Sequence, residues 1–269
     1  MTDDRRLAAL RARLDLAPEV AAALAAGRPV VALESTLISH GLPYPQNLEV
    51  AAAAEAAVRE SGAVPATVSV RDGRILVGLD AGTIETLATT DGVRKVARPT
   101  LAGALTAGGW GATTVSATML AAHAAGIRVF ATGGIGGVHP GAFEPSAGPD
   151  NRIRPPSLDV SVDLEELART PVVVVCAGPK AILDVPATLE VLESRGVPVV
   201  AIGTDELPGF FSRRSAIPAP QSVADEAAAA ALAAAHLALL GSGVLVCVPV
   251  PEADELPRAE ALAAITLAT

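Results

Sequence analysis

The stretch VVVVCAGPK, from Val172 to Lys180, is the most informative segment of this sequence. Four consecutive β-branched residues followed by Cys176 are typical of a buried strand in a parallel sheet. Gly178 and Pro179 then end the strand. The segment therefore predicts a parallel strand with Lys180 just after its carboxyl end.

The rest of the chain alternates short apolar strands with helical, alanine-rich segments, which predicts an α/β fold. The expected strands are Pro29–Leu33, Thr67–Val70, Ile75–Gly78, Ile127–Ala131, Val172–Cys176, Val197–Ile202 and Val244–Val248. The expected helices are Gln46–Ser61, Ala81–Thr90, Val115–Ala125, Ser161–Ala168, Pro186–Arg195 and Ser222–Leu240. Asp72-Gly73 between two strands indicates a hairpin, so the sheet should be mixed.

Composition excludes several classes of function. The chain has 269 residues, a net charge of −9 and no basic block, which argues against nucleic acid or an anionic membrane as a partner. The start of the chain, MTDDRRLAAL, lacks the apolar core of a secretion signal, and Cys176 and Cys247 lie in apolar runs typical of core thiols in a reducing compartment. We expect a soluble cytoplasmic protein.

Lysine usage is unusual. Lys95 and Lys180 are the only lysines, against eighteen arginines. Arginine replaces lysine well for solvated charge, but it cannot become a neutral nucleophile. This pattern favours amine chemistry at a lysine, and the alternative is codon bias that leaves two ordinary surface lysines.

Two strands run into polar loops. Ile127–Ala131 opens into TGGIGGVH, Thr132 to His139, where four glycines let backbone N–H groups turn toward an anion such as phosphate. Pro29–Leu33 runs into ESTLISHG, where Glu34 at a strand end suits general acid–base chemistry. The alternatives are a plain glycine turn and a helix-capping loop with a solvated glutamate.

Two further segments begin helices. GATTVSATM, Gly111 to Met119, offers hydroxyl groups that either bind phosphate or simply cap the helix. In SLDVSVDLEEL, Asp159 precedes a helix that starts near Ser161, and one carboxylate with waters can hold Mg²⁺ or Mn²⁺. Acidic first turns are also ordinary partners of the helix dipole. Together with the lysines, these features describe a site for a phosphorylated carbonyl compound or sugar.

Several blocks, in order, closely resemble the pseudouridine-5′-phosphate glycosidases, also called the pseudouridylate synthase or indigoidine synthase A family. The blocks are ALESTLISHGLPYPQN, GAVPATVSV, GATTVSATM, FATGGIGGVH, CAGPKAILD and VPVPE. The resemblance implies a single three-layer α/β/α domain over residues 1–269, with a mixed, mostly parallel sheet, and a homotrimer. It also implies reversible cleavage of pseudouridine 5′-phosphate to ribose 5-phosphate and uracil.

The resemblance assigns roles by position. Lys180 matches the nucleophile that forms a ring-opened, imine-type adduct, and Glu34 matches the general acid–base group. Asp159 matches the ligand of one Mn²⁺ (or Mg²⁺) per subunit. Residues placed around the substrate are Lys95, Val115, Thr132, His139, Ser161, Val162 and Asp163.

The sequence departs from the family pattern in two places. The loop Pro140–Ser157, with five prolines, is longer than in the family, and such a loop forms a lid, a partner contact or a disordered segment. The family continues past VPVPE into a helical segment with an asparagine-bearing active-site motif, and this chain ends at Thr269. We expect that segment to be lacking.

Two alternative functions remain open. The first is a catalytically weakened or inactive family member that binds ribose phosphates. The second is a lysine–imine enzyme that acts on another C-ribosyl phosphate.

Overall fold

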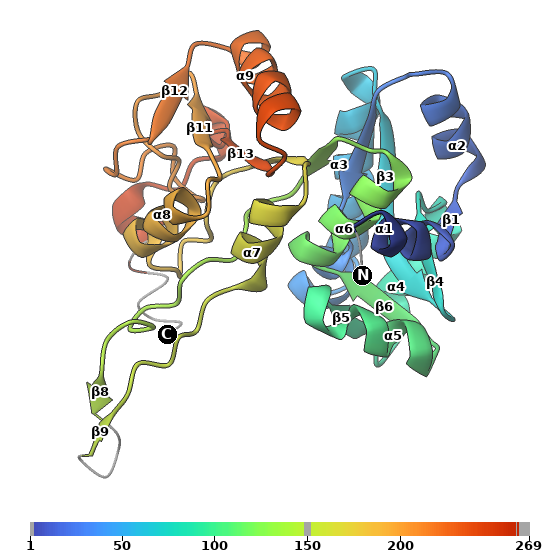
Figure 1. Ribbon diagram of the computed structural model, residues 1–269, viewed down its shortest axis with the longest axis horizontal. Helices are drawn as coiled ribbons and strands as arrows, with labels where there is room; N and C mark the ends of the chain where they lie inside the picture. Colours follow the sequence, from blue (N-terminus) through green and yellow to red (C-terminus); the bar gives the residue numbers. More distant parts are fainter. Residues whose placement is uncertain (1–2, 148–151, 262, 264–269) are drawn as a thin grey trace. The chain divides into compact units, whose positions relative to one another are not determined.

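The computed structural model describes residues 3–147, 152–261 and 263 (Figure 1). The described chain forms two compact units. The first comprises the described residues up to Thr132 together with Thr170–Val173, and the second comprises Gly133–Arg169 and the described residues from Val174 onward. The family resemblance predicts one domain over residues 1–269.

The first unit contains most of the sheet. Its strands are β1 (Leu14–Leu16), β2 (Val30–Leu33), β3 (Val64–Arg71), β4 (Arg74–Val77), β5 (Arg94–Val96), β6 (Trp110–Thr113) and β7 (Val129–Ala131). Its helical elements are α1 (Asp3–Arg11), α2 (Pro18–Ala25), η1 (Leu37–Gly41), α3 (Gln46–Glu60), α4 (Ala81–Thr89), η2 (Arg98–Thr100), α5 (Leu101–Ala107) and α6 (Val115–Ala125).

The sheet of the first unit is mixed, as predicted. Its strand order is β1-β4-β3-β2-β7, and β6 pairs with both β3 and β5. β1–β4, β2–β3, β2–β7 and β5–β6 are parallel, whereas β3 pairs antiparallel with β4 and with β6. The β3–β4 hairpin turns at Asp72 and Gly73, which have φ angles of 45° and 82°, so the hairpin prediction is confirmed.

β2 and β6 run toward each other along the same edge of β3. Leu33 at the end of β2 is in register with Thr67, and Ala112 near the end of β6 is in register with Ser69. The carboxyl ends of the two strands therefore face each other beside Val68. The β2–η1 loop, which contains Glu34, begins at this junction.

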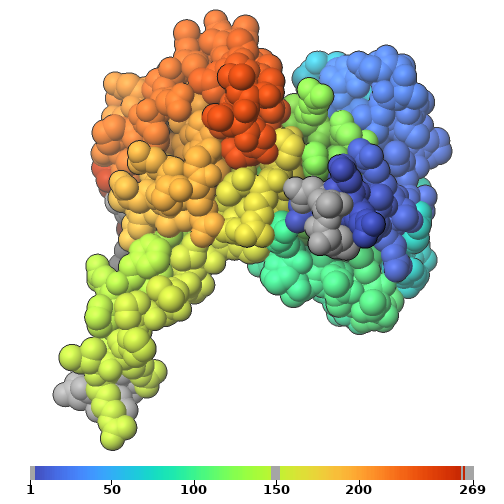
Figure 2. All heavy atoms as spheres, viewed as in Figure 1, coloured from blue at the N-terminus to red at the C-terminus, as the bar shows by residue number. Residues whose placement is uncertain are grey.

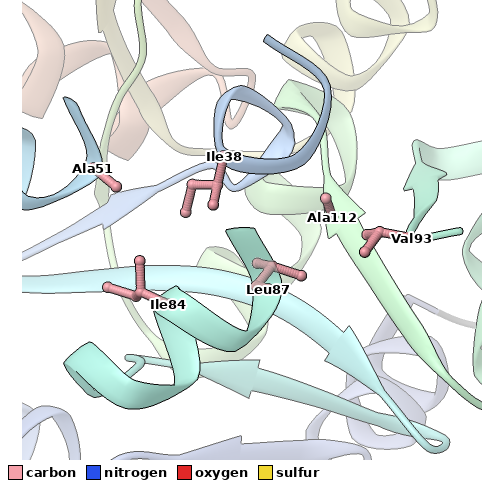
Figure 3. Close-up of a cluster of buried hydrophobic side chains, with 6 residues drawn as sticks. All are labelled: Ile38, Ala51, Ile84, Leu87, Val93 and Ala112. Carbon is pink, nitrogen blue, oxygen red and sulfur yellow. The ribbon is translucent and has the colours of Figure 1, made fainter. Parts of the chain in front are cut away.

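A hydrophobic cluster anchors that loop (Figure 3). Ile38 of η1 packs among five buried residues from α3, α4, β6 and the segment before β5, and Figure 3 shows its side chain directed into them. The cluster consists of Ile38, Ala51, Ile84, Leu87, Val93 and Ala112. Burying an isoleucine side chain contributes about 1.5–3 kcal/mol, so the cluster holds η1 in place.

Alanine-rich α6 is almost completely buried. It contacts α1 and the strands β1, β2, β3, β4, β6 and β7. Alanine allows this close approach because it adds little volume beyond the backbone. The alanine-rich sequence of α6 therefore lets this helix pack closely against the sheet.

The second unit has strands β8 (Ser146–Ala147), β9 (Ile153–Arg154), β10 (Val173–Cys176, from its second residue), β11 (Val199–Ile202), β12 (Gln221–Val223) and β13 (Val244–Cys247). Its helical elements are α7 (Val162–Arg169), α8 (Val185–Ser194), α9 (Glu226–Leu239) and η3 (Glu252–Asp254). The order β10-β13-β11-β12 includes parallel pairing of β11 with both β13 and β12. Both units thus confirm an α/β fold with a mostly parallel sheet.

The long loop forms a separate arm of the second unit. Antiparallel β8 and β9 pair through Ser146–Arg154 and Ala147–Ile153, and the arm extends away from α8 and α9 (Figures 1 and 2). Ile153 is 81% exposed. The part of the expected loop at residues 148–151 lies outside the described residues.

One helix prediction was wrong at its start. Residues 222 and 223 belong to β12, where Ser222 pairs with Ala201 of β11, and α9 begins only at Glu226. Asp225 stops the strand and caps the helix, because its side chain accepts a hydrogen bond from the N–H of Ala228 at 2.8 Å.

Candidate functional site

Glu34 lies beside Thr132 at the carboxyl end of the first unit's sheet. β2 and β7 are parallel, and Leu33 is in register with Ala131, so the next residue of each strand leaves the sheet at the same edge. The hydroxyl of Thr132 donates a hydrogen bond to Oε1 of Glu34. Both residues are half-buried. Glu34 is therefore a held carboxylate, not the solvated glutamate of a capping loop.

Ser35 and Thr113 close the junction between β2 and β6. The hydroxyls of both residues donate to the carbonyl of Val68, at 2.6 and 2.7 Å. The hydroxyl of Thr36 donates to the carbonyl of Thr113 at 2.8 Å. These polar side chains serve the fold, and they fix the backbone from which Glu34 projects.

Other polar residues of the same loop are also structural. The hydroxyl of Ser39 donates to the carbonyl of Leu87 at 3.2 Å, and Nε2 of His40 lies 3.0 Å from the carbonyl oxygen of Val93. Sequence reasoning missed Asn47, which is 3% exposed and donates to the carbonyl of Ile38 at 2.7 Å. The position of Asn47 at the start of a helix gave no signal of this contact.

Lys95 lies in β5, and Val115 follows the end of β6. Val96, which follows Lys95, is in register with Thr113, and the N–H of Thr114 donates to the carbonyl of Val96 at 2.8 Å. Lys95 is exposed, while Val115, the first residue of α6, is 1% exposed. Lys95 and Val115 therefore lie at the carboxyl ends of β5 and β6, and the end of β6 meets the end of β2 beside Val68.

Thr114 occupies the N-cap position of α6 without capping it. Its side chain makes no hydrogen bond to the helix, and its Oγ1 is buried without a partner among the described residues. Ser116 instead accepts a hydrogen bond from the N–H of Arg98 at 3.1 Å. The capping interpretation of this segment therefore fails for the Thr114 side chain.

In the second unit, the glycine loop holds the backbone that carries Lys180. The N–H of Ala177 donates to the carbonyl of Gly133 at 3.1 Å, and the N–H of Lys180 donates to the carbonyl of Ile135 at 3.0 Å. Ile135 also forms a parallel bridge with Pro179. The Lys180 side chain is exposed, and its amine makes no hydrogen bond or ion pair within the described chain.

Ser161 and Asp163 pack against the same glycine loop. Oδ2 of Asp163 accepts a hydrogen bond from the N–H of Gly136 at 3.0 Å, and the N–H of Ser161 donates to the carbonyl of Gly137 at 2.9 Å. Asp163 is buried, and Val162 between these two residues begins α7. The structure thus brings the predicted residues 161 to 163 to the loop that supports Lys180.

Three glycines of this loop, Gly134, Gly136 and Gly137, are required by packing. A Cβ on Gly136 would lie 2.2 Å from Oγ of Ser161, and a Cβ on Gly134 would lie 2.5 Å from the ring of Phe210. The N–H of Val138 donates to Oγ1 of Thr188 at 2.9 Å. With the N–H groups of residues 135, 136 and 138 bonded within the protein, these three donors are not open to an anion.

His139 and Asp159 lie side by side at the base of the arm. The N–H of His139 donates to the carbonyl of Asp159 at 3.0 Å, and Nδ1 of His139 lies 4.0 Å from Oδ2 of Asp159. Both side chains are largely exposed, at 45% and 64%. No three His, Cys, Asp or Glu side chains gather into a metal site in the part of the chain that the structure describes.

The two cysteines are core thiols, as expected. Both are buried and unoxidised. The hydrogen bond with Cys176, together with burial, raises the pKa of the Cys247 thiol well above its usual value. Cys176 accepts a hydrogen bond from the N–H of Gly178 at 3.2 Å. A thiol held protonated in this way is a poor nucleophile, so Cys247 is a packing residue, and Cys176 supports the lysine loop through its hydrogen bond with Gly178.

The fold and the lysine-bearing loop define an α/β protein with an exposed, structurally supported amine. The chain belongs to the family described as indigoidine synthase A like protein, whose model matches residues 19–269. It is 56% identical to a pseudouridine-5′-phosphate glycosidase of Methylobacterium nodulans, over 95% of this chain and 72% of that protein. It is 57% identical to the protein of the same name from Paracoccus denitrificans, over 91% of this chain and 78% of that one.

Two solved structures share the fold. The prealnumycin C-glycosynthase AlnA, in complex with ribulose 5-phosphate, matches with a TM-score of 0.84 and 41% identity, over 95% of this chain and 79% of that chain. An indigoidine synthase A-like protein of Thermotoga maritima matches with a TM-score of 0.80 and 33% identity, over 94% and 79%. Within the described residues, none of the helices is long and apolar enough to cross a membrane.

Proposed function

We propose that this chain is a pseudouridine-5′-phosphate glycosidase, which reversibly converts pseudouridine 5′-phosphate and water to ribose 5-phosphate and uracil. The main support is the identity of 56% and 57% to relatives with that name over more than nine-tenths of the chain. The positions of Glu34 and Lys180 at the ends of strands agree with it.

Lys180 supplies the nucleophile. Its neutral amine attacks the anomeric carbon, the bond from that carbon to the ring oxygen breaks, and the oxygen takes up a proton. The carbon–carbon bond to uracil then breaks as the nitrogen forms an imine, and water hydrolyses the imine to release ribose 5-phosphate. The Lys180 side chain is exposed, and its backbone is held by hydrogen bonds. This arrangement suits the role, because the amine can reach substrate while the backbone that carries it stays in place.

Glu34 supplies the proton transfers. Uracil leaves as a carbanion-like group, so its C5 must receive a proton as the bond breaks. A carboxyl group within reach can raise the rate of that step by a factor of about 10²–10⁴. The family resemblance places Lys95, Val115, His139, Ser161, Val162 and Asp163 around the substrate, and Thr132 lies beside Glu34.

The residues around Asp159 fit one hard divalent cation that keeps most of its water. A single exposed carboxylate, with His139 beside it, suits Mn²⁺ or Mg²⁺ bound mainly through water and is too sparse for a fully protein-coordinated metal. When bound, the cation would offset negative charge on the phosphorylated substrate. The proposal also includes a cytoplasmic location and a homotrimer. Light scattering tests the trimer as a mass of three chains of 26.9 kDa each.

A second candidate is a lysine–imine enzyme that acts on another C-ribosyl phosphate. The observation in its favour is the 41% identity to AlnA, a C-glycosynthase solved with ribulose 5-phosphate. The higher identity to the glycosidases places this candidate second.

Borohydride trapping tests the chemistry. The purified chain is incubated with ribose 5-phosphate, reduced with borohydride and weighed by mass spectrometry. We expect a covalent adduct on Lys180 and no adduct in a Lys180→Arg variant, since arginine keeps the charge and loses the nucleophile. The matched Lys95→Arg variant should still be trapped. An undiminished adduct in Lys180→Arg would rule out this nucleophile.

Uracil dependence separates the two candidates. A glycosidase consumes ribose 5-phosphate together with uracil in the synthetic direction, in equal amounts. A chain that is trapped by ribose 5-phosphate but ignores uracil would support the second candidate. A chain that binds ribose 5-phosphate without trapping would be an inactive family member.

A further inference from the structure

Thr132 and Glu34 are brought together by the register of two strands. Ninety-eight positions separate them in the sequence, yet the parallel pairing of β2 with β7 places them at adjacent strand ends. Both strands are held in place by the sheet, so the two side chains meet from rigid elements. The hydroxyl of Thr132 directs its proton at Oε1 of Glu34.

We propose that Thr132 is a positioning residue that orients the carboxyl group of Glu34 for proton transfer. This inference rests on the proposed function, in which Glu34 is the general acid–base group. A carboxyl group rotates freely about its terminal torsion unless one oxygen is held. With Oε1 held by Thr132, the direction of the other oxygen, Oε2, is also set.

The surrounding backbone leaves Thr132 well placed for this task. Ser35, the residue after Glu34, donates a hydrogen bond to the carbonyl of Val68 and accepts one from the N–H of Thr113. These two bonds fix the backbone at Glu34. The remaining freedom of Glu34 is therefore in its own side chain. The hydrogen bond from Thr132, on the neighbouring strand end, restricts that side-chain freedom, and positioning of a catalytic group depends on such supporting bonds.

The alternative role for Thr132 is a direct contact with substrate. The two roles differ in energetic coupling. A residue that acts only through Glu34 has no effect once the carboxyl group is gone, whereas a substrate contact weakens binding in any background.

A double-mutant cycle of Thr132→Val and Glu34→Gln tests the proposal. In the wild-type background we expect Thr132→Val to lower kcat roughly tenfold to a hundredfold with little change in KM, because only a transition-state contribution is lost. In the Glu34→Gln background the same change should have almost no effect. Thr132→Ser, which keeps the hydroxyl, should restore most of the activity.

Two measurements complete the test. Thermal unfolding of each variant reports any loss of fold, and Thr106→Val, at an exposed hydroxyl that bonds its own helix, serves as the matched control. Independent effects of Thr132→Val and Glu34→Gln that multiply, or a rise in KM alone, would overturn the proposal and assign Thr132 to substrate. Absence of glycosidase activity in the wild type would instead overturn the proposed function.

Discussion

Ser35 and Thr113 exchange two hydrogen bonds at the point where β2 and β6 meet. The N–H of Ser35 donates to the carbonyl of Thr113 at 3.2 Å, and the N–H of Thr113 donates to Oγ of Ser35 at 2.9 Å. Ser35 is fully buried and Thr113 is 1% exposed. The pair joins β2 and β6, which are not paired with each other as neighbouring strands of the sheet. Ser35 is the residue that follows Glu34.

We predict that Ser35→Ala destabilises the protein by about 1–3 kcal/mol. The change leaves the buried N–H of Thr113 without a partner, and an unsatisfied buried donor costs that amount. Urea unfolding measures the loss. Ser61→Ala is the matched control, because Ser61 is exposed and its hydroxyl bonds only the nearby carbonyl of Val58. Equal stability of the two variants would contradict this account.

We predict that Gly136→Ala destabilises the second unit by about 1–3 kcal/mol, a typical cost of overpacking. The new methyl group would lie 2.2 Å from Oγ of Ser161 and 2.9 Å from Oδ2 of Asp163. Gly133→Ala in the same loop is the control, since its Cβ would meet nothing within 4 Å. Chemical unfolding should leave Gly133→Ala within about 0.5 kcal/mol of the wild type. The reverse order of the two would show that the glycines are not packing positions.

We predict that Asp159→Asn abolishes binding of one Mn²⁺ per chain. A neutral amide is a much poorer ligand for a hard cation than a carboxylate. Titration of Mn²⁺ followed by electron paramagnetic resonance measures the stoichiometry without an activity assay. Asp91→Asn, at an exposed carboxylate in another loop, is the control. Unchanged stoichiometry in Asp159→Asn would remove the metal from this position.

We predict that stability falls as pH decreases from 7.5 to 5.5, in part through His236. Burial lowers the pKa of His236, whose Nε2 lies 2.7 Å from Oγ of Ser242. In the unfolded chain this histidine takes up a proton near the ordinary pKa of about 6.5, which is at a higher pH than in the folded chain. Lowering the pH therefore favours the unfolded state. At pH 7.5 both states are neutral and the penalty is absent.

The variant His236→Gln isolates that contribution. Glutamine cannot be protonated in this range, so the decrease in unfolding free energy between pH 7.5 and 5.5 should be smaller than in the wild type. Unfolding in urea at both pH values gives the comparison. A decrease as large as in the wild type would exclude His236 as a source of the pH dependence.

Much of the fold follows from local sequence patterns. The runs of β-branched residues gave β2, β7, β10, β11 and β13 within a few residues, and Asp72-Gly73 gave the hairpin. These features are local, because β-branching and positive φ act over neighbouring residues. The strands that were missed, including β5 and β6, are short and contain charged residues or glycine, such as Arg94, Lys95 and Gly111. Their pairing with neighbours, not their propensity, makes them strands.

The sequence by itself determined the α/β class, the two candidate strand ends at Glu34 and Lys180, and the family blocks around them. Only the tertiary structure decided that Thr132 bonds Glu34, that Ser35 and Thr113 are structural, and that the glycine loop supports Lys180 through its backbone. The physical reason is that strand register and close packing join residues far apart in the chain. Such contacts leave no periodic signal in the sequence.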